Sequence, residues 1–165
     1  MKLTIPAVAL AALALAGCSN VSTESDLTAL QYAGGSLQSK SFKDCVPPST
    51  REWGGIGDAF YEYPSSQRNF VFDSAAQTKD SGSFTFVTKD GIQMTVTGVA
   101  NFRLNTECET LRAFHESIGN RYKAYFSDGN NTPEGWGRVL TDYIGRPLDT
   151  AIDRAGQQYT SEALY

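Results

Sequence analysis

Apolar and polar residues alternate along residues 83–104, and this period-two pattern is the clearest in the chain. The second half of the stretch places apolar or small side chains on one face: Ile92, Met94, Val96, Gly98, Ala100, Phe102 and Leu104. Polar side chains occupy the other face, where Val99 is the apolar exception. Lys89-Asp90-Gly91 separates the two halves and contains Asp-Gly, a strong turn signal. The pattern predicts an antiparallel hairpin with one buried face over residues 83–104.

Beyond this hairpin the apolar residues recur at spacings of three and four, which is typical of helices. A first stripe consists of Leu111, Phe114, Ile118, Tyr122 and Tyr125. A second stripe consists of Trp136, Leu140, Tyr143, Ile144, Leu148 and Ile152. The turn-forming cluster 127–131 separates them, and Thr132-Pro133-Glu134 is a typical helix start. We therefore predict helices over 109–126 and 133–155, with a kink or a break at Gly145-Arg146-Pro147.

The first half of the chain shows shorter and less regular patterns. Leu27 to Ala33 and Asn69 to Asp73 predict strands. Between them we expect a polar loop to Cys45, an extended turn at Val46-Pro47-Pro48-Ser49-Thr50 and a glycine-rich loop at 54–57. Together with the hairpin and the helices, these patterns predict an α+β fold. In this fold an antiparallel sheet with a long central hairpin packs against two or three C-terminal helices.

The first eighteen residues have the pattern of a bacterial lipoprotein signal. A lysine precedes a short apolar run from Ile5 to Ala16, and Leu15-Ala16-Gly17-Cys18 is a lipobox. The alternative is a membrane-spanning helix, but such a helix needs about 20 apolar residues and this run is shorter. Residues 1–17 are therefore expected to be a signal peptide, and residues 18–26 a flexible tether anchored by lipid on Cys18. This predicts a cell-envelope protein on the extracytoplasmic face of a bacterial membrane, with membrane lipid as a partner.

The net charge and the cysteine content limit the classes of partner that are expected. Removal of the signal takes away one lysine and moves the formal charge from −4 to −5, so no basic surface for nucleic acid is expected. With Cys18 acylated, Cys45 and Cys108 remain as an even pair in an oxidising compartment, and we expect a disulfide between them. Two free thiols and a metal site are the alternatives. Two cysteines and the single histidine, His115, are a poor zinc set, so no metal is expected.

The sequence carries no signature of catalysis. It contains no Gly-x-Ser-x-Gly elbow, no Ser-x-x-Lys and no Gly-x-x-x-x-Gly-Lys phosphate loop. His115 lies beside the first helical stripe without partners, which indicates a solvated or boundary histidine. Asp149 and Asp153 have the spacing of paired acids, but Arg146 and Arg154 beside them favour an ordinary salt-bridged helix surface. We expect a protein that is not an enzyme and uses no cofactor.

An aromatic group surrounds the glycine-rich loop and consists of Trp53, Tyr61 and Tyr63. Aromatic clusters in loops bind sugars and peptides, so this group is a candidate ligand loop. The alternative is a satellite core under a long loop.

The order of the motifs resembles the SPFH family, which includes stomatin, prohibitin, flotillin and the bacterial regulators of membrane proteases. The matching segments are, in chain order, Tyr32-Ala33-Gly34-Gly35, the Val46 to Thr50 turn, Val87 to Leu104, a helix with Leu111 to Tyr122, and Val139 to Asp149. The hairpin turn Thr88-Lys89-Asp90-Gly91 and its alternating return strand match best, and the Gly-Arg-Pro-Leu-Asp helix at 145–149 supports them. The resemblance covers residues 27–165, which we take as one SPFH-like domain.

The resemblance implies an α+β scaffold domain at a membrane surface, without a catalytic centre. Members of the family assemble into rings or platforms and bind or restrain membrane proteases and channels. They usually attach through an N-terminal hydrophobic segment, for which the lipid on Cys18 would substitute. The family continues with a further helix, a closing strand and a long coiled coil, whereas this sequence stops at Tyr165, as a truncated or reduced member would.

The sequence therefore predicts a non-enzymatic, lipid-anchored membrane scaffold of the SPFH type that organises or regulates membrane proteins. Its expected partners are membrane lipid, membrane proteins and further copies of itself. One alternative is a ligand-binding or cell-wall-binding lipoprotein that uses the aromatic loop. Another is a cell-wall hydrolase built on Asp149 and Asp153.

Overall fold

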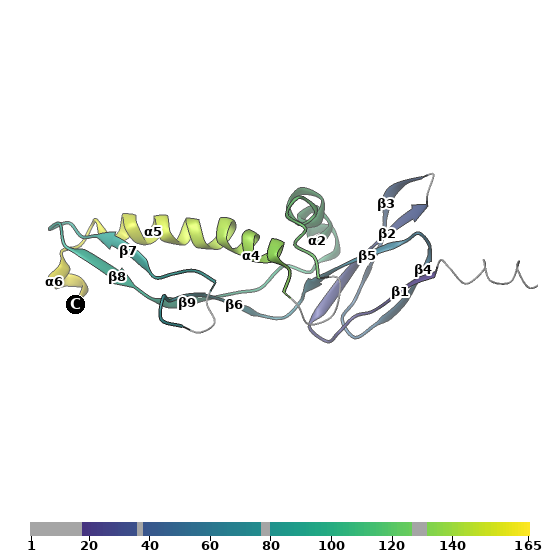
Figure 1. Ribbon diagram of the computed structural model, residues 1–165, viewed down its shortest axis with the longest axis horizontal. Helices are drawn as coiled ribbons and strands as arrows, with labels where there is room; N and C mark the ends of the chain where they lie inside the picture. Colours follow the sequence, from purple (N-terminus) through teal and green to yellow (C-terminus); the bar gives the residue numbers. More distant parts are fainter. Residues whose placement is uncertain (1–17, 36–37, 77–79, 127–131) are drawn as a thin grey trace, which may run out of the picture. The chain divides into compact units, whose positions relative to one another are not determined.

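The computed structural model has an α+β fold with antiparallel sheets and C-terminal helices, as the sequence predicts (Figure 1). It describes residues 18–35, 38–76, 80–126 and 132–165. The expected signal peptide, residues 1–17, lies outside these ranges. The chain divides into two compact units, residues 1–65 and residues 66–165, which are described separately below.

The first unit is built from two antiparallel sheets. Its strands are β1 (Cys18–Ser22), β2 (Leu27–Gly35), β3 (Gln38–Val46), β4 (Arg51–Ile56) and β5 (Ala59–Pro64). β1 pairs with β4, and β2 lies between β3 and β5. Val21 from the first sheet joins Ala29 and Val46 from the second in a small core, with Phe60 packed against it. The unit is therefore a small sandwich whose core is supplied by both sheets.

Two expectations for the first unit are wrong. Strand β1 forms where a flexible tether was predicted, and strand β3 forms where a polar loop was predicted. In β1, the side chain of Val21 is buried and Cys18–Ser22 pairs with β4, so this part of residues 18–26 is not a flexible tether. The hydroxyl of Thr23 then donates to the carbonyl oxygens of Pro47 and Thr50 at 2.7 and 2.9 Å. The sequences of these segments are polar because edge strands of a small sandwich bury few of their side chains.

The glycine-rich segment predicted as a loop is a hairpin formed by β4 and β5. Its turn contains Gly57, whose φ of 84° favours glycine, and Asp58. The Asp58 carboxylate accepts hydrogen bonds from the Gly55 N–H and the Gln31 side-chain amide, both at 2.8 Å. The Gly55 N–H, together with the side chains of Lys43 and Gln31, lowers the pKa of Asp58. The turn is thus fixed by a carboxylate that remains charged.

The second unit combines two strand pairs with C-terminal helices. Its strands are β6 (Arg68–Phe72), β7 (Phe84–Val87), β8 (Gln93–Val96) and β9 (Gly98–Phe102). Its helical segments are α2 (Cys108–Phe114), η2 (His115–Gly119), α3 (Asn120–Tyr122), α4 (Glu134–Leu140), η3 (Thr141–Gly145), α5 (Arg146–Gly156) and α6 (Ser161–Leu164). Helix α5 packs against β7, as Figure 1 shows.

The predicted hairpin is confirmed, but its return strand is divided. β8 pairs with β7 across the turn, whereas β9 pairs with β6. The division falls immediately before Gly98, where a Cβ atom would lie 2.7 Å from the ring of Phe72. A glycine is required there because the two strand pairs meet at the Phe72 ring, which stacks on Phe84 at 4.8 Å.

Both long helices contain a π-helical turn that the sequence pattern does not reveal. The segment η2 continues directly from α2 and into α3, and η3 connects α4 to α5. The predicted break into two helices at Gly145-Arg146-Pro147 is therefore wrong, because residues 134–156 are helical throughout. A kink at this position stays a prediction. A π-helical turn shifts the backbone hydrogen bonds by one residue, and here it immediately precedes Pro147, which cannot donate one.

Substitution by alanine should change the free energy of unfolding in opposite directions at two helical glycines of this unit. A Cβ atom on Gly156 would overlap the ring of Phe86 in β7, whereas nothing lies within 4 Å of one on Gly137. We expect Gly156→Ala to lower the free energy of unfolding by about 1–3 kcal/mol through overpacking. Gly137→Ala should raise it by roughly 0.5–1 kcal/mol, because alanine favours the helix. Urea unfolding of the two variants checks this, and changes of the same sign would contradict the packing of α5 on β7.

Candidate functional surfaces

The lipobox cysteine is the first residue of strand β1. Its backbone pairs with that of Ile56 in β4. Ile56 is 77% exposed, and Trp53, three residues earlier in the same strand, is 63% exposed. The expected acylation site therefore belongs to a strand, and the residue paired with it, Ile56, has an exposed hydrophobic side chain.

The predicted disulfide is confirmed, since Cys45 and Cys108 are both disulfide-bonded. Cys45 is part of β3, and Cys108 begins α2. Within the described ranges, no group of three or more His, Cys, Asp or Glu side chains is placed to hold a metal ion.

The three aromatic residues proposed as a ligand loop lie in two different strands and do not form a loop. Trp53 belongs to β4, whereas Tyr61 and Tyr63 belong to β5. Tyr63 is fully buried, so a ligand cannot reach it. The ring of Tyr61 packs edge-on against Tyr32, and its hydroxyl accepts a hydrogen bond from Lys40. Tyr63 is thus structural, Tyr61 is partly buried by its contacts, and Trp53 is the most exposed of the three.

His115 is buried, with 3% of its surface exposed, so the expectation of a solvated or boundary histidine is wrong. It is the first residue of the π-helical segment η2, and its ring lies 6.3 Å from that of Tyr125. His115 lies four residues after the fully buried Leu111, so a regular helical period already places it on the buried side of the helix. The expectation failed because the apolar stripe was continued from Leu111 to Phe114 and not to His115.

The acidic pair expected on the last helix has the surroundings of an ordinary helix surface. Asp149 is exposed in the first turn of α5, and the Asp153 carboxylate accepts a hydrogen bond from Gln157 at 3.0 Å. One turn earlier, Arg146 donates to Asp142 at 3.1 Å. These i,i+4 pairs are those of a solvated helix face.

A polar groove of about 600 Å³ follows helices α4 and η3 within the second unit. It is lined by Asp80, Thr132, Pro133, Glu134, Gly137, Arg138, Thr141, Asp142 and Arg146. Its charged groups engage each other: Arg138 pairs with Glu134, and Asp142 accepts from both Arg146 and the Tyr122 hydroxyl. The Asp142 carboxylate raises the pKa of Tyr122, because the phenol donates to it. The four-residue spacing of these charges was visible in the sequence, but their position along a groove was not.

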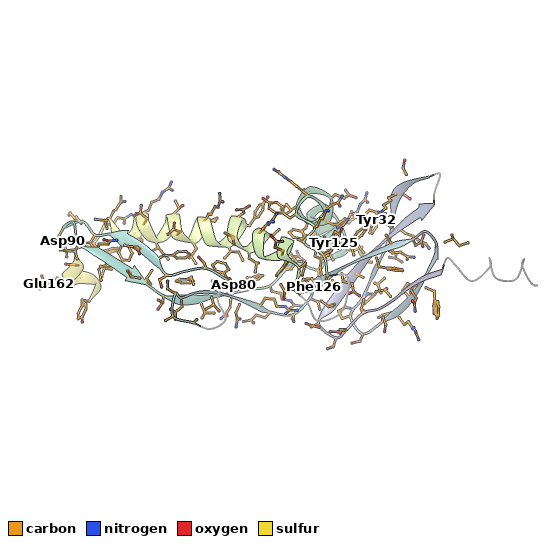
Figure 2. All side chains as sticks on the ribbon, in the orientation of Figure 1. Tyr32, Asp80, Asp90, Tyr125, Phe126 and Glu162 are labelled. Atoms are coloured by element: carbon orange, nitrogen blue, oxygen red, sulfur yellow. The ribbon has the colours of Figure 1, made fainter. Side chains whose placement is uncertain are left out.

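The turn of the β7–β8 hairpin binds the start of α6. The Asp90 carboxylate accepts hydrogen bonds from the Ser161 N–H at 2.9 Å and from the Ser161 hydroxyl at 2.6 Å. The Lys89 N–H donates to the Tyr159 carbonyl at 2.9 Å. Figure 2 shows Asp90 at the hairpin tip near Glu162 of α6. Gly91 has a φ of 80°, which completes the turn and explains the Asp-Gly sequence.

An apolar groove of about 550 Å³ lies beside this turn, lined by Ile92, Met94, Ser161, Glu162 and Tyr165. Ile92 and Tyr165 are both exposed. Exposed apolar surface bordered by polar groups is typical of protein contact sites.

The contact between Asp90 and Ser161 should be lost at low pH and on substitution of Asp90. Hydrogen bonds from Ser161 and Thr88 lower the pKa of Asp90 from 3.8 to about 2. Since the folded-state pKa is depressed, the contact is complete above the usual carboxyl range and is lost as the pH falls through about 2. We expect Asp90→Ala to accelerate hydrogen exchange at the Ser161 amide, measured by NMR. Glu162→Ala, which removes the neighbouring acid of α6, should leave that amide protected; equal exchange in both variants would contradict the contact.

Within the described ranges, no helix is both long and apolar enough to cross a membrane. Comparisons with known proteins return no matching family, no matching curated protein and no matching solved structure.

Proposed function

We propose that this chain is a lipid-anchored scaffold of the SPFH type that organises membrane proteins on the extracytoplasmic face of a bacterial membrane. Acylated Cys18 anchors it, and partner proteins and further copies of the chain dock on its second unit. Its role is positional and not catalytic.

The observation that carries this proposal is the contact between the hairpin turn and the segment that follows α5. The Thr88-Lys89-Asp90-Gly91 turn gives the best match to the family, and the Gly-Arg-Pro-Leu-Asp motif begins the helix α5 that returns to it. Asp90 binds Ser161 and Lys89 binds Tyr159 immediately after that helix. The turn motif therefore contacts the segment that follows the helix begun by the second motif, an arrangement that supports assigning both motifs to one domain.

The apolar groove beside this turn supports a docking role. Ile92 and Met94 from the hairpin and Tyr165 line it together. The nearby side chains of Val87 and Tyr159 are also exposed. Hydrophobic side chains kept at the surface by a hydrogen-bonded turn favour contact with another protein.

The test uses the full chain in bacterial membranes. We expect radiolabelled palmitate to be incorporated into the chain, and Cys18→Ala to abolish both the label and recovery in the membrane fraction. Chemical cross-linking should then join the acylated chain to membrane proteins. Ile92→Asp should remove these cross-linked products, because it places a charge in the apolar groove.

The matched control is Val99→Asp, which changes an exposed apolar residue of β9 that does not line this groove. This variant should cross-link like the unmodified chain. An unlabelled chain would overturn the lipid anchor. Cross-linking that is equally strong in the Ile92→Asp variant would overturn the docking role of the groove.

A further inference from the structure

The β1–β4 sheet presents a face with exposed side chains that the proposed scaffold role does not use. Antiparallel pairing places Asn20 opposite Trp53 and Ser22 opposite Arg51. Residues directly opposite each other project to the same side of the sheet. A bulge between the Cys18 and Asn20 pairings inserts an extra residue into β4, so that Cys18 pairs with Ile56. Asn20, Ser22, Arg51 and Trp53 are all exposed, and so is Ile56.

On the opposite side of the sheet, β1 faces the core of the first unit, whereas Glu52 of β4, which pairs with Val21, is exposed. Val21, which lies between Asn20 and Ser22 in β1, is buried against Ala29 and Val46. Trp53 and Ile56 are therefore not fragments of this core. Among the described residues of this unit, Trp53 and Ile56 are the large hydrophobic residues whose side chains are exposed.

The chemistry of this face suits the interface of a lipid bilayer. Tryptophan concentrates at the headgroup level of membranes, because its ring is apolar and its N–H can remain hydrated. The Arg51 guanidinium lies 5.3 Å from the centre of the Trp53 ring. An arginine in this position can reach lipid phosphate while its stem covers apolar surface. Ile56 adds an aliphatic side chain at the end of the strand.

The position of the lipobox cysteine identifies the bilayer as the occupant of this face. Paired residues of antiparallel strands have Cα atoms about 4.5–5.5 Å apart, so the residue that would carry the lipid is a direct neighbour of Ile56. Because strand β1 begins at Cys18 itself, no flexible residues separate the attachment point from the sheet. The anchor would therefore keep Trp53 and Ile56 at the membrane surface.

We propose that the face formed by Arg51, Trp53 and Ile56 inserts into the headgroup region of the bilayer that holds the lipid anchor, and so fixes the orientation of the first unit. This inference rests on the acylation of Cys18 in the proposed function. The lipid holds the chain at the membrane, and the β1–β4 face determines which side of the unit lies against it.

The test is tryptophan quenching in the full acylated chain, reconstituted in vesicles of phosphatidylcholine and phosphatidylglycerol. Parallel vesicles contain phosphatidylcholine with brominated acyl chains, which quench tryptophan on contact. The chain has two tryptophans, and Trp136 is buried in the second unit. We expect brominated lipid to remove up to about half of the total emission, the share of one tryptophan at the membrane interface. Trp53→Phe should abolish this loss, and Ile56→Ser should reduce it.

The controls separate this inference from the proposed function. Mass spectrometry of the same sample reports the acyl group, and Val99→Ser, a matched change at an exposed aliphatic residue of the second unit, should leave the quenching unchanged. Acylated chain whose emission is the same in both kinds of vesicle would overturn the inference alone. A chain without an acyl group would overturn the anchor and the inference together. Circular dichroism of each variant shows that its fold is intact.

Discussion

Replacement of both Cys45 and Cys108 by serine is expected to lower the free energy of unfolding by about 4 kcal/mol. The disulfide closes a loop of more than sixty residues, and such a constraint removes many conformations from the unfolded chain. Since domains of this size are stable by only about 5–15 kcal/mol, the variant should lose a large part of its stability. Urea unfolding followed by far-ultraviolet circular dichroism measures the difference.

Reduction of the unmodified protein provides the control for this prediction. Its unfolding curve in excess phosphine should approach that of the double-serine variant, whereas the variant itself should not respond to reductant. A loss of less than about 1 kcal/mol would mean that the bond contributes far less than loop closure requires.

Phe70→Ala is expected to cost about 3–5 kcal/mol, the usual result of removing a buried phenylalanine ring. Phe70 lies in β6 and is fully buried. Its ring contacts the helix at Gly145, where a Cβ atom would lie 3.0 Å from the ring edge. The ring therefore packs the sheet against the π-helical segment η3, and its loss leaves a cavity that a backbone held by both elements cannot close.

The matched control for Phe70 is Val99→Ala in the paired strand β9. Val99 is exposed, so this change should alter the free energy of unfolding by no more than about 0.5 kcal/mol. Urea unfolding of both variants in the same buffer gives the comparison. Similar values for the two positions would contradict the placement of Phe70 in the core.

The sequence predicted the second unit better than the first, for physical reasons. The β7–β8 hairpin and the C-terminal helices bury one continuous face, so their apolar residues recur with a clear period. The π-helical turns that begin at His115 and at Thr141 shift that period by one residue, and no residue type in the sequence indicates such a shift. The continuity of the helix through Pro147 could therefore not be predicted, whereas the burial of His115, four residues after Leu111, follows a regular helical period.

Strand β2 was predicted because it buries a run of side chains, whereas β1, β3 and β4 escaped prediction because they bury few. β1 contributes Val21 to the core and otherwise carries polar residues. The glycines of β4 also read as a loop, although they belong to a strand. The disulfide could be predicted from the even number of remaining cysteines, but the exposed face around Trp53 depends on strand pairing between distant segments. That pairing is a tertiary feature, which local patterns do not contain.

The proposed function requires that this chain assembles into a membrane scaffold. The most direct test is the native mass of the acylated chain, extracted in mild detergent and measured by size-exclusion chromatography with light scattering. We predict a discrete assembly with a protein mass many times that of one chain. A monomer would contradict the claim.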